Sequence, residues 1–160
     1  MTFNAALYTG KSGCYAAAMV DPLFNPWIAM MRAALGLGDD IDMEPHATII
    51  YSKEKVLTQP VPQLPLEADA HVHEIEFFEG HKGDVVIALG VDCPELHDCH
   101  ELMKTAGAEH SYPEYKAHIT LARIPEMTQE LKNRISDLNL VLGTKPVSLL
   151  FSHFYVEDLS

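Results

Sequence analysis

Two short stretches of this chain nearly repeat each other. Residues 46–49 read His-Ala-Thr-Ile, and residues 118–121 read His-Ile-Thr-Leu. In an extended strand, residues i and i+2 point to the same face, so each histidine shares a face with its threonine. An imidazole takes or gives a proton near neutral pH, and a hydroxyl binds an oxygen ligand. Two such strands brought together would supply an acid, a base and two hydroxyls, which suffices to cleave a phosphate ester without a metal. The four polar members of the repeats are therefore the candidate catalytic residues: His46, Thr48, His118 and Thr120.

The sequence before the first repeat predicts a strand and a helix. Residues 13–20 are able to form a strand. Asn25 followed by Pro26 reads as a helix N-cap with proline in the first turn, and the glycines after Leu35 predict the end of that helix. A polar loop then leads into a strand over residues 46–51.

The second half of the chain repeats this order. Residues 70–78 and 84–91 predict two strands, and the glycine-containing turn between them predicts a hairpin. Pro94 opens a helix that ends near Gly107, and a loop leads into a strand over residues 118–123. In both halves, a strand and a helix precede a His-x-Thr strand, which indicates a weak internal duplication.

The remaining segments complete an α+β fold with two similar lobes. Residues 58–69 carry three prolines and predict an extended connection between the lobes. Thr128 is a candidate cap for a helix to about Asp137, and residues 147–156 predict a last strand. A length of 160 residues with 48% hydrophobic content fits one domain, residues 1–160.

The net charge of −12 narrows the class of ligand. The chain has 11 basic against 23 acidic residues. Proteins that hold long nucleic acids usually present a basic surface, because phosphate neutralisation dominates their affinity. The composition therefore argues against a general RNA binder, whereas a small anion needs only a local positive pocket. Acidity that simply keeps the protein in solution is the alternative interpretation.

Neither a signal peptide nor a membrane span is predicted. The apolar stretch of residues 27–37 is short and is interrupted by Arg32. Cys14, Cys93 and Cys99 are an odd number at irregular spacing, which fits free thiols in a reducing cytosol. We therefore expect a cytoplasmic protein.

Other histidines and cysteines carry weaker signals. His71 and His73 lie two residues apart, but their neighbours are acidic, and we interpret them as an exposed strand face. A second group suggests zinc, but its spacing matches no common paired-ligand pattern, and its two histidines fit one face of a polar helix. We expect no metal at this group, which comprises Cys93, His97, Cys99 and His100.

Both repeats resemble the motifs of a known family, and so does the wider run around the second repeat, residues 115–123, which reads Tyr-Lys-Ala-His-Ile-Thr-Leu-Ala-Arg. The chain is similar to the two-histidine phosphoesterase superfamily, the LigT-like enzymes, whose mark is a pair of H-x-(T/S)-x motifs with a hydrophobic last position. That family often has proline where Ala117 stands, a difference that touches strand entry rather than chemistry. The resemblance implies a bilobal fold of two related antiparallel sheets flanked by helices, with the site in a central cleft.

Within that superfamily, the chain most resembles the phage anti-CBASS enzymes, which degrade cyclic di- and trinucleotides of bacterial immune signalling. The resemblance implies a small cyclic oligonucleotide substrate, no cofactor, and action in the host bacterial cytoplasm. It also implies a ribose 2′-hydroxyl as the attacking group and a linear product ending in phosphate. Two alternatives stay open: an RNA 2′,3′-cyclic phosphodiesterase, and a binding module that sequesters a cyclic nucleotide. The symmetric motifs leave the assignment of acid and base open.

Substrate-binding candidates come from the neighbourhood of the motifs. Lys116 and Lys53 lie close to them and would raise the local positive potential. Glu157, near the end of the last strand, is positioned to contact a base edge or a ribose hydroxyl. Aromatic side chains stack on bases, although each is equally suited to packing. The aromatic candidates are Tyr8, Tyr15, Trp27, Tyr51 and Tyr112, of which Tyr15 is the one we select with Lys116 and Glu157.

Overall fold

The computed structural model describes residues 13–38, 44–53, 57, 63–109 and 114–159. Each helix and strand expected from the sequence is present in this part of the chain. They are β1 (Cys14–Val20), α1 (Asn25–Ala34), β2 (His46–Ser52), β3 (Ala68–Glu79), β4 (Val85–Asp92), α2 (Pro94–Thr105), β5 (His118–Ile124), α3 (Gln129–Thr144) and β6 (Val147–Asp158). None of the described helices has the length and hydropathy of a membrane span.

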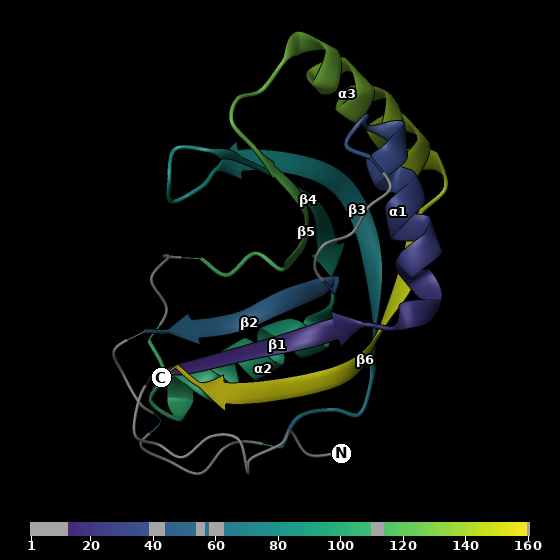
Figure 1. Cartoon of the computed structure of the whole chain (residues 1–160). Helices are drawn as coiled ribbons and strands as arrows, with labels where there is room; N and C mark the ends of the chain where they lie inside the picture. Colours follow the sequence, from purple (N-terminus) through teal and green to yellow (C-terminus); the bar gives the residue numbers. More distant parts are fainter. Residues whose placement is uncertain (1–12, 39–43, 54–56, 58–62, 110–113, 160) are drawn as a thin grey trace.

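The six strands form one closed antiparallel ring in the order β1-β2-β5-β4-β3-β6. The expectation of an α+β protein with antiparallel sheets is confirmed, but the sheets are continuous rather than separate. β3 and β6 have 12 residues each, and their first residues pair with each other, whereas their later residues pair within one half, β3 with β4 and β6 with β1 (Figure 1). The halves join where residues 68–72 pair with residues 147–151, and again at one residue pair between β2 and β5.

The ring has an approximate internal symmetry that matches the duplicated sequence. One half contains β6, β1 and β2, and the other contains β3, β4 and β5, in the corresponding order. Each half holds a strand-helix-strand unit, with α1 in the first and α2 in the second. The two motif strands, β2 and β5, are neighbours where the halves meet.

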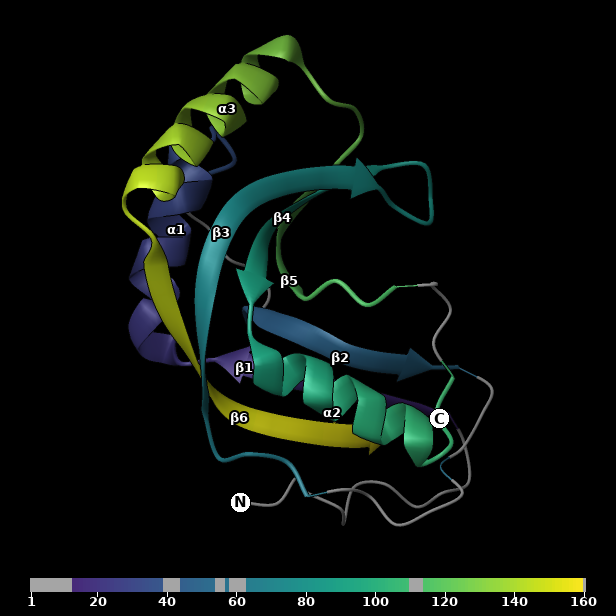
Figure 2. The ribbon, with the colours of Figure 1, turned by 180° about the vertical axis from the view of Figure 1, so that it is seen from behind.

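The helices pack on the ring and enclose one apolar core. α2 lies along β1 and β2, while α1 and α3 lie side by side on another flank (Figures 1 and 2). The alternating pattern of β2 and β5 turns Ala47, Ile49, Ile119 and Leu121 into this core. Burial of that face leaves the other face of both strands for polar side chains.

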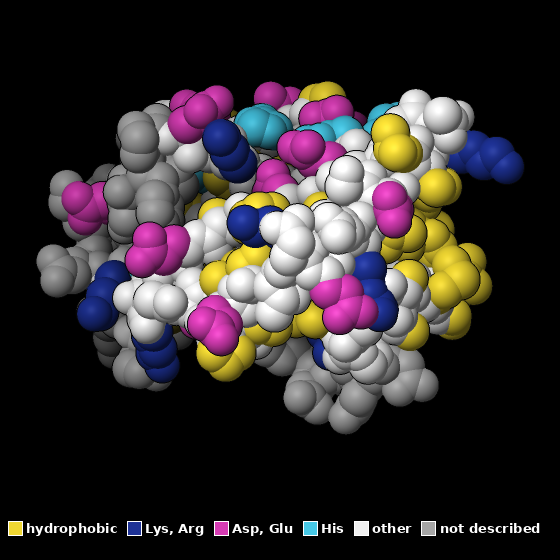
Figure 3. Space-filling model, turned by 90° about the horizontal axis from the view of Figure 1, so that it is seen from above, with side chains coloured by type: hydrophobic (Ala, Val, Ile, Leu, Met, Phe, Trp, Pro, Cys, Tyr) yellow, Lys and Arg dark blue, Asp and Glu magenta, His cyan; other side chains and the backbone are white. Residues whose placement is uncertain are grey.

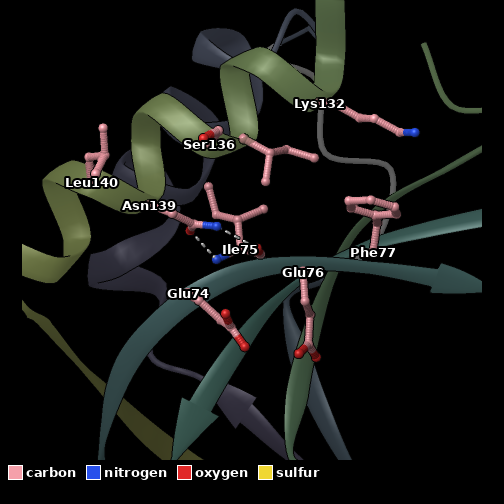
Figure 4. A pocket seen from close by; sticks show the side chains of 9 residues that line it. Glu74, Ile75, Glu76, Phe77, Lys132, Ser136, Asn139 and Leu140 are labelled. Atoms are coloured by element: carbon pink, nitrogen blue, oxygen red, sulfur yellow. Dashed lines mark hydrogen bonds between the residues drawn. The ribbon is translucent and has the colours of Figure 1, made fainter. Parts of the chain in front are cut away.

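One side chain attaches α3 to the open edge of β3. The Ile75 amide donates to Asn139 Oδ1 at 2.7 Å, and Asn139 Nδ2 donates to the Ile75 carbonyl at 2.9 Å. Asn139 therefore takes the place of a neighbouring strand at a point that β6 does not reach. Figure 4 shows Phe77 on the α3 side of the strand, while Glu74 and Glu76 point away from that helix.

Several predicted boundaries shift. The Thr128 side chain caps α3 as predicted, accepting from the Leu131 amide at 3.2 Å, but the helix continues past Asp137. Asn25 is not the N-cap: a short 3₁₀ turn over Pro22–Phe24 precedes α1, so Asn25 already lies inside the helical run. In the proline-rich connection predicted over residues 58–69, residues 58–62 lie outside the described residues, residues 63–67 belong to no helix or strand, and β3 already begins at Ala68.

Replacing Asn139 tests the attachment of α3. We expect Asn139→Ala to lower the free energy of unfolding by about 1–3 kcal/mol, since it removes two hydrogen bonds of about 0.5–1.5 kcal/mol each. Asn133→Ala is the control, because Asn133 lies on the same helix and its side chain accepts only from the exposed Gln129. Urea unfolding of both variants measures the difference. Equal stability of the two variants would contradict this account.

Candidate active site

The two motifs meet where the halves of the ring join. The pair that links β2 to β5 is Ala47 with Ile119, the second residue of each motif, and both side chains are fully buried. Because side chains alternate along a strand, the histidine and threonine of both motifs point to the opposite face. We call this the His-Thr face; it is defined by His46, Thr48, His118 and Thr120.

The register at this junction crosses the motifs. In an antiparallel pair centred on Ala47 and Ile119, extension by one residue in either direction places each histidine across from the other motif's threonine. His46 then lies across from Thr120, and Thr48 across from His118. The structure thus brings the four predicted catalytic residues together on one face.

Both imidazoles are held in the same way. His46 Nδ1 lies 2.9 Å from the Glu44 carbonyl oxygen, and His118 Nδ1 lies 2.9 Å from the Lys116 carbonyl oxygen. A carbonyl oxygen only accepts hydrogen bonds, so Nδ1 carries the proton in each neutral ring. This leaves Nε2 of each ring able to accept a proton, and to give one back once the ring is charged.

A β-bulge follows each motif threonine. Along β2, Thr48 pairs with Ala17 and Ile50 with Ala16, so Ile49 has no partner on β1. Along β5, Thr120 pairs with Ala88 and Ala122 with Ile87, leaving Leu121 in the corresponding place. A bulge re-aims the neighbouring side chains, and here it does so at the same position of both motifs.

Aromatic side chains extend the His-Thr face around Thr48. The Tyr15 hydroxyl lies 3.3 Å from Thr48 Oγ1. The Tyr15 ring contacts the rings of Tyr51 and Tyr155 edge-on, with centroids 6.1 and 6.0 Å apart. Burial, followed by the neighbouring Tyr15 hydroxyl, raises the pKa of Tyr155 well above its ordinary value, so this hydroxyl stays protonated. Glu157 pairs across the sheet with Tyr15 and shares its face.

The surroundings of His118 are different. Phe78 contacts its ring edge-on with centroids 5.2 Å apart. Gly90 pairs with His118, and a Cβ on that glycine would come within 2.8 Å of the His73 ring. A glycine at position 90 therefore leaves the space that the His73 ring occupies. His73 Nδ1 lies 3.8 Å from Glu74 Oε1.

The predicted substrate-binding residues have distinct environments. Tyr15 and Glu157 belong to the group beside Thr48, while Lys116 has an exposed side chain and contributes its carbonyl to His118. Lys53 is exposed, Tyr51 is half-exposed and Trp27 packs partly buried against the core. Tyr8 and Tyr112 lie outside the described residues.

Sequence reasoning overlooked Phe78 and Tyr155 as neighbours of the motifs. Tyr155 was open to detection, because His153, Tyr155 and Glu157 alternate with buried residues along β6 and therefore share a face. Phe78 gave no comparable signal, since its contact with His118 joins β3 to β5, two strands that are not neighbours in the ring.

The cysteines are free, as predicted, and the structure shows that all three are buried. Burial raises the pKa of Cys14 and Cys93 to about 11 and that of Cys99 to about 12, so all three stay protonated thiols. His71 and His73 are exposed, also as predicted. His100 corrects the interpretation of α2 as polar, because this side chain is only 2% exposed. Within the described residues, no three His, Cys, Asp or Glu side chains form a group able to hold a metal ion.

Comparison with known proteins places these motifs in a family. The family model described as anti-CBASS protein Acb1 matches residues 12–150. The chain belongs to the Acb1 family. Relatives named anti-CBASS protein Acb1 include those of Vibrio phage KVP40 (25% identical, covering 70% of this chain and 73% of the relative), Acinetobacter phage Ac42 (26%, covering 92% and 91%) and Escherichia phage RB16 (28%, covering 92% and 81%). The Acb1 match includes both His-x-Thr strands and helix α2 between them.

The imidazole contacts make a spectroscopic prediction. At a pH where the rings are neutral, we expect His46 and His118 to carry the proton on Nδ1, because each Nδ1 faces a carbonyl oxygen. Nitrogen-15 NMR of histidine-labelled protein, assigned with single His→Gln variants, distinguishes protonated from unprotonated ring nitrogens. Protonated Nε2 in both neutral rings would contradict the geometry.

Proposed function

We propose that this chain is a metal-independent phosphodiesterase that cleaves 3′-5′ bonds of cyclic di- and trinucleotide immune messengers, and so counters CBASS in the bacterial host cytoplasm. Membership of the Acb1 family supports the anti-CBASS role. We also assign residues 1–160 to a single domain of the two-histidine phosphoesterase class, with substrate held over the His-Thr face in a cleft between the lobes.

The observation that carries the proposal is the matched pair of imidazoles. His46 and His118 share one face beside the Ala47–Ile119 pair, and each donates from Nδ1 to a carbonyl. Each Nε2 is therefore the atom that exchanges protons. A phosphodiester bound between the rings has one proton acceptor and, with the other ring charged, one proton donor.

The reaction proceeds in two steps. One neutral histidine takes the proton of a ribose 2′-hydroxyl at Nε2 while that oxygen bonds to the adjacent phosphorus. The bond from phosphorus to the 5′-oxygen breaks, and the opposite imidazolium gives its proton to this leaving oxygen. The ring opens to a linear nucleotide with a 5′-hydroxyl and a 2′,3′-cyclic phosphate. With the roles of the histidines exchanged, water then opens the cyclic phosphate and leaves a terminal phosphate.

The threonines and the aromatic side chains have supporting roles. Thr48 and Thr120 donate hydrogen bonds to the non-bridging phosphate oxygens as charge moves onto them. Tyr15, Tyr51 and Tyr155 next to Thr48, and Phe78 next to His118, offer ring surfaces to bases. Glu157 and Lys116 complete the substrate-binding residues that we assign.

The histidine pair predicts strong non-additivity. We expect His46→Ala and His118→Ala each to lower the rate of cleavage by about two to four decades, the usual contribution of a general acid or base. The double variant should be little slower than either single one, because the two side chains act as a unit. His71→Ala is the control, since His71 is exposed, bonds to Ser148 and belongs to neither motif. A folded His46 or His118 variant with near-normal activity would contradict the paired mechanism.

The surface charge predicts the size of the substrate. On the face seen in Figure 3, the described Lys and Arg side chains lie among acidic ones and form no continuous basic stripe. We expect a cyclic di- or trinucleotide to be cut far faster than long single-stranded RNA, since each phosphate along a tract needs a basic partner. Competition assays at several salt concentrations measure this. Equal cleavage of long RNA with a steep salt dependence would favour the RNA-processing alternative.

A further inference from the structure

The peptide carbonyl of each bulge is held by a helix from the other half of the molecule. His100 of α2 donates from Nδ1 to the Ile49 carbonyl of β2 at 2.7 Å. Arg32 of α1 donates from Nη1 to the Leu121 carbonyl of β5. Ile49 and Leu121 are the fourth residues of the two motifs and follow the threonines directly.

The connections are crossed with respect to the chain. α1 lies between β1 and β2, the unit that carries the first motif, yet Arg32 holds the second motif. α2 lies between β4 and β5, the unit that carries the second motif, yet His100 holds the first. The same contact therefore occurs twice, related by the internal symmetry of the ring.

The bulges leave the backbone carbonyls of Ile49 and Leu121 in need of hydrogen-bond donors. Ile49 has no partner on β1 and Leu121 has none on β4, so the regular ladder does not pair their backbones. β2 and β5 pair with each other only at Ala47 and Ile119. Ile49 and Leu121 therefore also lie outside the ladder between β2 and β5. A buried carbonyl without a donor is costly, so the side chain that supplies one fixes where the carbonyl points.

A tyrosine strengthens the contact at the first motif. The Tyr115 hydroxyl donates to the Thr48 carbonyl at 2.7 Å, and its ring stacks on His100 with centroids 4.2 Å apart and 9° between planes. Burial raises the pKa of Tyr115 well above its ordinary value, so its hydroxyl remains a donor. The stacked pair thus donates hydrogen bonds to two successive carbonyls, those of Thr48 and Ile49. In a regular strand these two carbonyls would point to opposite sides.

We propose that His100 and Arg32 are reciprocal positioning residues that set the aim of the motif threonines. His100, together with Tyr115, fixes the bulge after Thr48, and Arg32 fixes the bulge after Thr120. The inference rests on the proposed function only in that the aimed hydroxyls contact the scissile phosphate. A purely structural role would change stability without a specific effect on one threonine.

Paired variants separate positioning from packing. His100→Leu keeps most of the buried volume and removes the donor, whereas His100→Asn keeps an N–H donor near the place of Nδ1. On a cyclic dinucleotide, we expect His100→Leu to lower kcat by about tenfold or more with little change in KM, because a displacement of about 1 Å at a reacting group can cost about a hundredfold. His100→Asn should recover most of kcat. His97→Leu is the control, since His97 contacts the same tyrosine ring from an exposed position of α2.

A second measurement is independent of catalysis. In protein labelled at threonine methyl groups, Thr48 and Thr120 are assigned by Thr→Ser substitution and followed by NMR. His100→Leu should shift the Thr48 methyl signal and leave Thr120 in place, while Arg32→Met should do the reverse. Arg134→Met is the control for the loss of an arginine, because Arg134 pairs only with the exposed Glu130 on its own helix. If His100→Leu fails to fold, Tyr115→Phe takes its place. This variant removes one hydroxyl and should shift the methyl signal of Thr48 but not that of Thr120.

The outcomes decide between the two proposals. Crossed methyl shifts without cleavage of any cyclic nucleotide would support the positioning roles and reject the proposed function. Cleavage by the unaltered chain, together with methyl shifts that are absent or equal at both threonines, would overturn the positioning roles alone. A His100→Asn variant as slow as His100→Leu would also overturn them, because the restored donor would then be irrelevant.

Discussion

The single residue pair between β2 and β5 is the contact on which the site depends. Ala47 and Ile119 close the ring of strands, and their burial turns the neighbouring histidines and threonines to the same face. A register shifted by one residue would send these side chains into the core. A short junction of this kind is weakly specified by itself, so contacts elsewhere must fix it. Arg32 and His100 provide such contacts, one from each half of the molecule.

Local patterns in the sequence predict much of the fold. Strand alternation, the proline at the start of α2 and the Thr128 cap locate elements because each is a short-range effect. The duplicated order of elements also anticipates the two related halves. Closure of the ring was not predictable in the same way, because pairing of β3 with β6 joins segments that are distant in the chain.

In the candidate site, too, the residues in local motifs were predictable and the residues that depend on long-range contacts were not. His46 and His118 are recognisable because the motif occurs twice, but the donors behind the motifs have no motif of their own. Arg32 reads in the sequence only as an interruption of an apolar helix, and His100 as one histidine of a polar one. Their roles depend on carbonyls that become available only when β2 and β5 bulge. A charged or polar residue within an apolar helical stretch is a signal to look for such a partner.

The central claim is that the imidazoles of His46 and His118 turn over a cyclic nucleotide rather than merely bind it. The most direct test mixes a cyclic dinucleotide in large excess over the protein, in the presence of EDTA, and resolves the products by chromatography and mass spectrometry. The account predicts many rings opened per protein molecule, to linear products that end in phosphate. Consumption of no more ring than there is protein, or activity that returns only when a divalent metal is added, would contradict it.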